Sequence, residues 1–277
     1  MDNCYIPRKA RIIDIIQETK SNLNIKTFQV KLLEGGFAYQ PGQFAEVTAF
    51  GVGEAPFCIA SAPVQKDYLE FSIKETGLVS GAIHSLRIGD LIGIRGPFGN
   101  CFPYETFAGK NLVFVAGGIG LAPLRSLINY VLDESNRENY GKVEMLLAFR
   151  SPEDVVYRWN FGDWEKSRDV AITYTIDRTS EGWPHTVGFP HTLLDRLQLL
   201  KQADTYVVTC GPPVMIKSVT GELEKMKVPP ERIITTLEMR MTCGLGKCGK
   251  CNIGHQYVCV DGPVFSLAQL SEMPGEY

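Results

Sequence analysis

The alternation of apolar and polar residues changes its period once along this chain, between residues 97 and 110, and this change limits the possible folds. From Arg8 to Pro97, short alternating runs such as IKTFQVKL and LEFSIK are separated by turn-forming stretches such as QPGQ and RIGD. This pattern is typical of an antiparallel β-barrel. One short helix, at residues 79–86, is expected to interrupt it.

From about Lys110 onward, apolar strands alternate with helical patterns. Helices are expected from Leu121, near residues 191–199 and over residues 213–226, between strands such as NLVFVAG, VEMLLAF and TYVVTCG. Strands that alternate with helices predict a parallel sheet in a Rossmann-like α/β domain. The last region, residues 238–277, is rich in glycine and cysteine and shows neither period. The chain is therefore expected to divide into residues 1–104, 105–237 and 238–277.

Composition excludes several classes of protein. A chain of 277 residues with 44% hydrophobic content is long enough for two buried cores and a small appendage. A net charge of -3 with mixed signs argues against a nucleic-acid partner. The N-terminus lacks the apolar core of a signal peptide, and the most apolar run, LVFVAGGIGLAPL, is too short for a membrane span. We therefore expect a cytoplasmic protein whose eight cysteines serve metal or redox chemistry.

A glycine-rich turn in VFVAGGIGLAP predicts a phosphate-binding site. An apolar strand runs into Gly117, Gly118 and Gly120, and a helix follows with Pro123 in its first turn. Backbone N–H groups and the helix dipole can approach a pyrophosphate there without obstruction by side chains. A tight turn that binds nothing is the alternative. A second strand that ends in TCGPPVM, residues 209–215, favours the dinucleotide site, because strand ends of a parallel sheet line one crevice.

Four cysteines near the end of the chain follow the pattern C-x4-C-x2-C-x7-C, at Cys243, Cys248, Cys251 and Cys259. Glycines between them allow a short loop to surround a metal centre with its N–H groups pointing inward. The spacing is that of plant-type [2Fe-2S] ferredoxins. A Cys4 zinc site is the alternative, although zinc favours two C-x2-C units. A Rieske centre is disfavoured, because His255 has no second histidine nearby.

GGIGLAP and CGPPVM, in this order after a barrel, resemble the ferredoxin-NADP reductase superfamily. In that family the barrel holds a flavin and the second domain holds a nicotinamide dinucleotide. The resemblance implies a flavin-binding barrel at residues 1–104, an NAD(P)-binding α/β domain at 105–237 and a [2Fe-2S]-binding segment at 238–277. The stretch from residue 237 to residue 266 resembles the C-terminus of flavoprotein electron-transfer subunits, such as the sulfhydrogenase gamma subunit, the corresponding flavoprotein of anaerobic sulfite reductase and the electron-transfer subunit of dihydroorotate dehydrogenase.

The flavin motif of that family is altered in this chain. In APFCIAS, Phe57 matches the aromatic position, but Ala55 replaces the family's arginine and Cys58 replaces its hydroxyl residue. FAD is expected, and the missing arginine leaves FMN open. In GLVSGAIH, Ser80 is expected to be the helix N-cap and an anion contact. The resemblance assigns cofactor contacts to Phe57, Cys58, Ile59, Gly77, Val79, Ser80, Gly117, Gly118, Gly120, Pro123, Asp177, Cys210, Gly211, Pro212 and Met215, and catalytic positions to Cys58 and Cys210.

Asp177 bears on the choice of dinucleotide. It ends the strand YTID, where relatives contact the adenosine ribose, and a carboxylate there favours a 2′-hydroxyl over a 2′-phosphate. NAD is therefore expected, while Arg150 and Arg178 nearby keep NADP possible.

The resemblance implies an electron-transfer (diaphorase) subunit of a larger redox complex. Electrons would pass between NAD(P)H, the flavin and the [2Fe-2S] cluster, to or from catalytic and iron-sulfur subunits such as those of a hydrogenase, sulfite reductase or heterodisulfide reductase. A nucleotide-binding regulatory or scaffold subunit with a structural Cys4 zinc site is the alternative.

Overall fold

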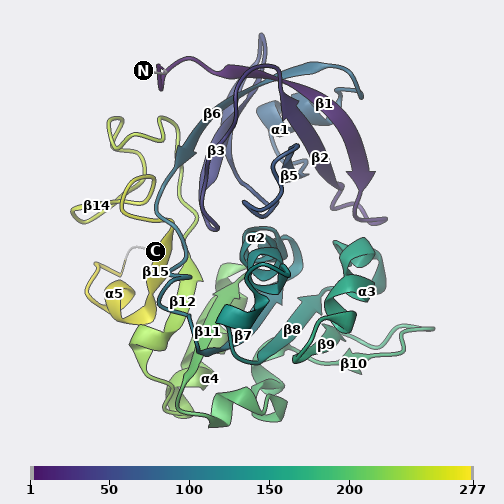
Figure 1. Ribbon diagram of the computed structural model, residues 1–277, viewed down its shortest axis with the longest axis vertical. Coiled ribbons are helices and arrows are strands. Elements are labelled where there is room, and N and C mark those ends of the chain that lie inside the picture. Colours follow the sequence, from purple (N-terminus) through teal and green to yellow (C-terminus); the bar gives the residue numbers. More distant parts are fainter. Residues whose placement is uncertain (1–2, 276–277) are drawn as a thin grey trace.

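The computed structural model describes residues 3–275 (Figure 1). The outer ends of the first and third expected units, residues 1–2 and 276–277, lie outside this range. An antiparallel sheet formed by the first hundred residues lies above a largely parallel sheet, and the C-terminal segment runs along one flank of both (Figure 1). No helix among the described residues has both the length and the apolar character required to cross a membrane.

The N-terminal unit is a six-stranded antiparallel sheet in the order β4-β3-β6-β1-β2-β5. Its edge strands β4 and β5 contact each other, which closes the barrel that the alternating pattern predicts. Alternate residues such as Phe28, Val30 and Val47 fill its interior. The strands are β1 (Arg8–Gln17), β2 (Ile25–Leu32), β3 (Phe44–Ala49), β4 (Gly53–Cys58), β5 (Leu69–Lys74) and β6 (Leu91–Phe98), with helix α1 (Leu78–His84) between β5 and β6.

The second unit is built on a seven-stranded sheet in the order β10-β9-β8-β7-β11-β12-β15, which is parallel except for β15. Helices α2 and α3 cover the face toward the barrel side, and α4 covers the opposite face (Figure 1). The elements are β7 (Asn111–Gly117), α2 (Leu121–Leu132), β8 (Val143–Phe149), α3 (Arg158–Lys166), β9 (Val170–Ile176), β10 (Thr186–Val187), β11 (Thr205–Cys210), α4 (Pro213–Lys225) and β12 (Ile233–Thr236).

Three elements differ from the expectation. The helix expected near residues 191–199 is wrong: short 3₁₀ turns at Pro190–Thr192, Leu194–Arg196 and Leu199–Lys201 bury leucines separately against α4 and the sheet. Helix α3 is not among the expected helices. It has no apolar period in the sequence, and only Trp164 of its residues is buried. Strand β4 is not among the expected strands either. It contains Pro56, which an edge strand tolerates because one side of it needs no ladder hydrogen bonds.

A buried polar network fixes the barrel against α2 and α3. The guanidinium of Arg125 lies 2.5 Å from the carboxylate of Glu70, and both side chains are 3% exposed. The same guanidinium lies over the rings of Tyr157 and Trp159, and the hydroxyl of Ser126 donates to the carbonyl of Ser61. The two units are therefore joined by a buried, hydrogen-bonded polar contact.

The C-terminal segment is tied to both units. Strand β15 (Val264–Ser266) pairs with β12, and α5 (Leu267–Ser271) follows it. The side-chain amide of Asn100 donates to the carbonyls of Asp261 and Val264, at 2.8 and 2.7 Å. Between β12 and β15, the cysteine-rich loop carries only a short hairpin, β13 (Asn252–Ile253) and β14 (Gln256–Tyr257). The loop is thus held at both ends, next to the barrel.

Candidate functional site

The two glycine-containing turns predicted from the sequence lie side by side at the ends of β7 and β11. A Cβ atom added to Gly120 would lie 2.6 Å from the carbonyl of Cys210, and one added to Gly117 would lie 2.3 Å from Sδ of Met215. At position 120 only glycine permits this approach, because the atoms that a Cβ would meet there belong to the backbone. By contrast, Gly118 has a positive φ of 54° and no atom near the position of an added Cβ, so its backbone is open.

A cavity of about 570 Å³, called here the strand-end cavity, opens above these turns. The N-terminus of α2 borders it, and the helix dipole and free N–H groups suit a pyrophosphate. Its walls include the predicted residues Gly117, Gly118, Gly120, Asp177, Gly211, Pro212 and Met215.

Asp177 lies at the far end of this cavity, where an outer cavity of about 560 Å³ joins it. Burial raises the pKa of the Asp177 carboxyl, and the neighbouring Arg150 and Arg178 oppose that rise. Phe189 borders both cavities with half of its surface exposed and stacks on His191. The sequence does not predict Phe189 as a site residue, because it lies next to the segment expected to be a helix.

A further cavity, called the interdomain cavity, has a volume of about 350 Å³ and lies at the ends of β4 and β5. Phe57 and Cys58 from β4 border it, together with Pro123 from α2. Ile59 does not border it, since its side chain is fully buried in the barrel core. The lining of this cavity combines apolar groups, such as the ring of Phe57, with the polar residues Ser72 and Thr76, and a flavin ring needs both kinds of contact.

The turn before α1 differs from the prediction. The helix is capped by Gly77, whereas Ser80 lies in its first turn, so the prediction that Ser80 is the N-cap is wrong. The Ser80 hydroxyl accepts the N–H groups of Thr76 and Gly77, both at 2.9 Å, and donates to the Gly77 carbonyl at 3.1 Å. Ser80 thus shapes the turn that carries Thr76 to the cavity, while Val79 packs on the barrel core.

The strand-end and interdomain cavities meet. Lys74, Ile119 and Glu238 border both of them. Neither Lys74 nor Glu238 is predicted from the sequence as a site residue. A charged residue that ends an apolar strand is the available signal, since Lys74 ends β5 and Glu238 follows β12 closely.

The two predicted catalytic thiols lie near this junction. Cys210 is 3% exposed and borders neither cavity, and its Sγ accepts a hydrogen bond of 2.9 Å from the hydroxyl of Thr236. Burial raises the pKa of Cys210 to about 12, although the bond from Thr236 opposes this. Burial also raises the pKa of Cys58, and Cys210 adds to that rise. Both thiols are therefore protonated at neutral pH.

Backbone N–H groups point at the sulfurs of the cysteine-rich loop. Those of Leu245 and Lys247 donate to Sγ of Cys243, both at 3.4 Å, and that of Gly246 donates to Sγ of Cys259 at 3.2 Å. Burial alone would raise the pKa of Cys243, but the N–H groups of Leu245 and Lys247, together with the backbone and side chain of Cys248, outweigh it and lower the pKa to about 6. The loop is thus prepared for a thiolate at Cys243, whereas burial raises the pKa of Cys259 to about 12.

The four sulfurs are arranged in two pairs. Cys248 adjoins Cys243 and helps to lower its pKa, and Cys251 adjoins Cys259 and helps to raise its pKa. Within residues 3–275, no three His, Cys, Asp or Glu side chains are grouped closely enough to hold one metal ion. Cys251 and Cys259 are buried, whereas Cys248 is exposed. The pair around Cys248 is therefore the side of the loop that faces outward.

The loop begins at the edge of the interdomain cavity. Met239 and Met241 border that cavity, and Cys243 follows two residues later. Phe44 also borders the cavity, and its ring lies 5.8 Å from that of Phe98 in the core beneath the loop. The strand-end cavity, the interdomain cavity and the cysteine-rich loop thus follow one another without interruption.

Known families match all three units. Residues 12–103 match the oxidoreductase FAD-binding domain, residues 114–221 the oxidoreductase NAD-binding domain, and residues 238–271 the iron-sulfur cluster binding domain of dihydroorotate dehydrogenase B. These matches confirm that the chain has domains that bind FAD, NAD and an iron-sulfur group.

Two relatives span almost the whole chain. Sulfhydrogenase 1 subunit gamma of Pyrococcus furiosus is 35% identical over 282 residues, which cover 99% of this chain and 95% of the relative. The probable dihydroorotate dehydrogenase B (NAD(+)) electron transfer subunit of Methanocaldococcus jannaschii is 30% identical over 263 residues, which cover 94% of this chain and 89% of the relative.

Solved structures support the fold. The NADH-dependent reduced ferredoxin-NADP oxidoreductase studied for flavin-based electron bifurcation has a TM-score of 0.71 at 20% identity, over 99% of this chain and 91% of the other. The cytochrome b5 reductase domain of Ulva prolifera nitrate reductase has a TM-score of 0.69 at 23% identity, over 84% of this chain and 98% of the other.

The predicted family and fold class are confirmed by these matches, and nothing in them supports the alternative of a scaffold subunit with structural zinc. The chain belongs to the family of FAD- and NAD-binding oxidoreductase subunits with an iron-sulfur domain that includes the sulfhydrogenase gamma subunits and the electron transfer subunits of dihydroorotate dehydrogenase B.

Proposed function

We propose that this protein passes electrons from NADH, through FAD, to a [2Fe-2S] cluster and on to a partner subunit. The observation that carries the proposal is the order of the three sites. Lys74, Ile119 and Glu238 connect the strand-end cavity to the interdomain cavity, and Met241 connects the interdomain cavity to Cys243. A dinucleotide in the strand-end cavity, a flavin in the interdomain cavity and a cluster in the cysteine-rich loop would then lie one after another, and the cluster would be at the flank of the molecule.

Each site supplies what its group needs. The turn at Gly118 offers open backbone to a pyrophosphate, and Gly211 borders the same cavity. The neutral thiol of Cys58 and the ring of Phe57 border the place for a flavin ring. A bound flavin takes up a hydride from a nicotinamide and exchanges single electrons with an iron-sulfur centre. The side chains of this chain orient the two groups and exclude water; none of them has to act as a nucleophile.

The paired sulfurs support a [2Fe-2S] cluster over a zinc ion. Such a cluster takes two thiolates on each of its two irons, so it needs two pairs of cysteines, as Cys243 with Cys248 and Cys251 with Cys259 provide. A zinc ion needs four ligands around one point. The N–H groups that point at Cys243 and Cys259 would offset the negative charge of the sulfurs.

The decisive test of the cluster is its iron content. Anaerobically purified protein is expected to contain iron and acid-labile sulfide in equal amounts and to give an S = 1/2 EPR signal after reduction with dithionite. Cys251→Ser should remove the signal and keep the flavin absorbance, because Cys251 borders no part of the interdomain cavity. Cys101→Ser, a half-buried thiol outside the loop, is the matched control and should change neither. Stoichiometric zinc without iron would contradict the proposal.

NADH is the proposed nucleotide because the carboxyl of Asp177 lies where the strand-end and outer cavities join. A carboxylate accepts hydrogen bonds from the ribose 2′-hydroxyl and repels a 2′-phosphate. Asp177→Ala is expected to reduce the ratio of kcat/KM for NADH to that for NADPH by roughly tenfold, the effect of one charge-assisted hydrogen bond. Asp163→Ala, on the exposed face of α3, is the control. A wild type that prefers NADPH would instead assign Arg150 and Arg178 to the 2′-phosphate.

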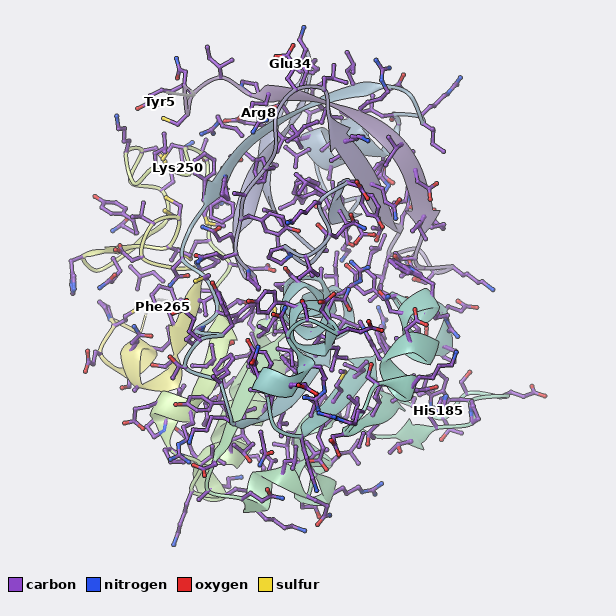
Figure 2. The ribbon with its side chains drawn as sticks, viewed as in Figure 1. Tyr5, Arg8, Glu34, His185, Lys250 and Phe265 are labelled. Carbon is purple, nitrogen blue, oxygen red and sulfur yellow. The ribbon has the colours of Figure 1, made fainter. Side chains whose placement is uncertain are left out.

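The partner is proposed to be a catalytic or iron-sulfur subunit of a larger oxidoreductase, as the names of the relatives indicate for those proteins. It would receive electrons at the exposed Cys248 side of the loop. Tyr5 and Lys250 lie on this same flank (Figure 2).

A further inference from the structure

A buried arginine of the barrel wall holds the first cysteine of the loop. Arg95 lies on β6, and its side chain is 5% exposed. Its Nη1 donates to the backbone carbonyl of Cys243 at 2.7 Å, a contact across 148 residues of sequence. Its Nη2 and Nε donate to the two carboxylate oxygens of Glu54 at 2.5 and 3.3 Å. Its Nη1 also donates to the carbonyl of Cys4 at 3.4 Å, so one planar guanidinium joins β4, β6, the N-terminal residues and the cysteine-rich loop.

The surroundings leave the guanidinium little freedom. Its Cζ lies 5.0 Å from the centre of the Phe98 ring, a cation–π distance. The same ring lies directly beneath Gly244, where an added Cβ would be 2.6 Å from it. The backbone next to Cys243 therefore rests on Phe98 while Arg95 binds its carbonyl.

Glu46, the cross-strand neighbour of Arg95, does not share in its hydrogen bonds. It pairs with Arg95 across the β3–β6 ladder and is fully buried, yet neither of its carboxyl oxygens has a hydrogen-bond partner among the described residues. Arg95 faces Glu54 on one side and the loop carbonyl on the other.

We propose that Arg95 is a positioning residue for the iron-sulfur cluster, which fixes the Cys243 end of the loop to the barrel and raises the reduction potential of the cluster by its permanent positive charge. The proposal rests on the function proposed above. Reduction adds one negative charge to the cluster, and a nearby buried cation stabilises that charge. The charge of arginine itself does not change with pH in proteins. Glu54 would oppose the effect of Arg95.

The test is a redox titration of the full-length protein, followed by the cluster EPR signal. Arg95→Met removes the charge and keeps much of the bulk, Arg95→Lys keeps the charge, and Glu54→Gln removes the opposing charge. Arg11→Met is the matched control, because Arg11 also donates to a backbone carbonyl, that of Gly89 at 2.7 Å, but on an exposed part of the barrel.

The reduction potential of the cluster is expected to be highest in Glu54→Gln and lowest in Arg95→Met. The wild type and Arg95→Lys should share an intermediate value. Arg95→Met should shift the ratio of oxidised to reduced cluster about tenfold, which is about 59 mV for a one-electron couple. If Arg95 served only in folding, Arg95→Met would lower the unfolding temperature, and the potentials of the variants would not follow this order. If Arg95→Met does not retain iron, the positioning role is supported and Glu54→Gln measures the charge effect.

Two results would overturn the inference in different ways. Potentials of Arg95→Met and Glu54→Gln that equal that of the wild type would overturn the inference alone. A wild type that binds no iron would overturn the proposed function and the inference together.

Discussion

Glu46 illustrates how far a single residue departs from its behaviour in water. Burial raises the pKa of its carboxyl from 4.5, the value for an exposed glutamate, to about 8. The negative charge of Glu54 adds to this rise in pKa, while Arg95 opposes it. Between these two values the folded protein binds a proton that the unfolded chain has lost. The contribution of Glu46 to stability is therefore complete at low pH and is lost as the pH rises toward 8.

This sign leads to a prediction for Glu46→Gln. The glutamine has no proton to lose, so the free energy of unfolding of the variant should improve relative to wild type as the pH rises from about 6 to about 8, by at most about 1.4 kcal/mol per pH unit. Denaturant unfolding at several pH values measures this. Glu231→Gln, at an exposed position, is the control and should show no such trend. A difference between Glu46→Gln and wild type that is independent of pH would contradict the raised pKa.

The sequence predicts residues whose roles depend on local spacing. Cys243, Cys248, Cys251 and Cys259 can be found because a metal-binding loop is short and its pattern is contained in it. The role of Arg95 cannot be found in this way, since its contact with Cys243 depends on the register of the barrel and on the path of a distant loop.

At the scale of elements, the approach of two turns controls the strand-end cavity. Gly120→Ala would place a methyl group 2.6 Å from the carbonyl of Cys210, so the β7 and β11 turns must separate. We expect a loss of about 1–3 kcal/mol in unfolding free energy and a raised Kd for NADH. The Kd can be measured by titration of the protein with NADH.

Gly162→Ala is the matched control for this substitution. Gly162 lies inside α3, and an added Cβ meets no atom within 4 Å. Alanine should stabilise this helix by up to about 1 kcal/mol. If Gly120→Ala were as neutral as Gly162→Ala, the close packing of the two turns would be refuted.

Elements with a strong period are predictable from the sequence, and those that depend on tertiary contacts are not. The five barrel strands other than β4 and the helices α2 and α4 carry their apolar pattern in the sequence. Helix α3 and the 3₁₀ turns at residues 190–201 lack such a pattern, because they fold against a surface that other elements create. Capping of α1 by Gly77 is missed, since serine is the more common cap.

At the scale of the whole molecule, the relative placement of the three units determines the function. No sequence pattern indicates that Arg125 and Glu70 form a buried ion pair between the units, or that β15 completes the second sheet. These long-range contacts place the cavities and the cysteine-rich loop in one series. The central claim is therefore that electrons follow this series.

The most direct test is to mix NADH with the protein under anaerobic conditions and to record flavin absorbance and the cluster EPR signal over time. We predict that the flavin is bleached first and that the S = 1/2 signal then appears without any other reductant, while flavin-free protein and Cys251→Ser give no signal. The opposite result would be a flavin that NADH bleaches fully, beside a cluster that dithionite reduces and NADH leaves oxidised. That result would contradict the proposed path.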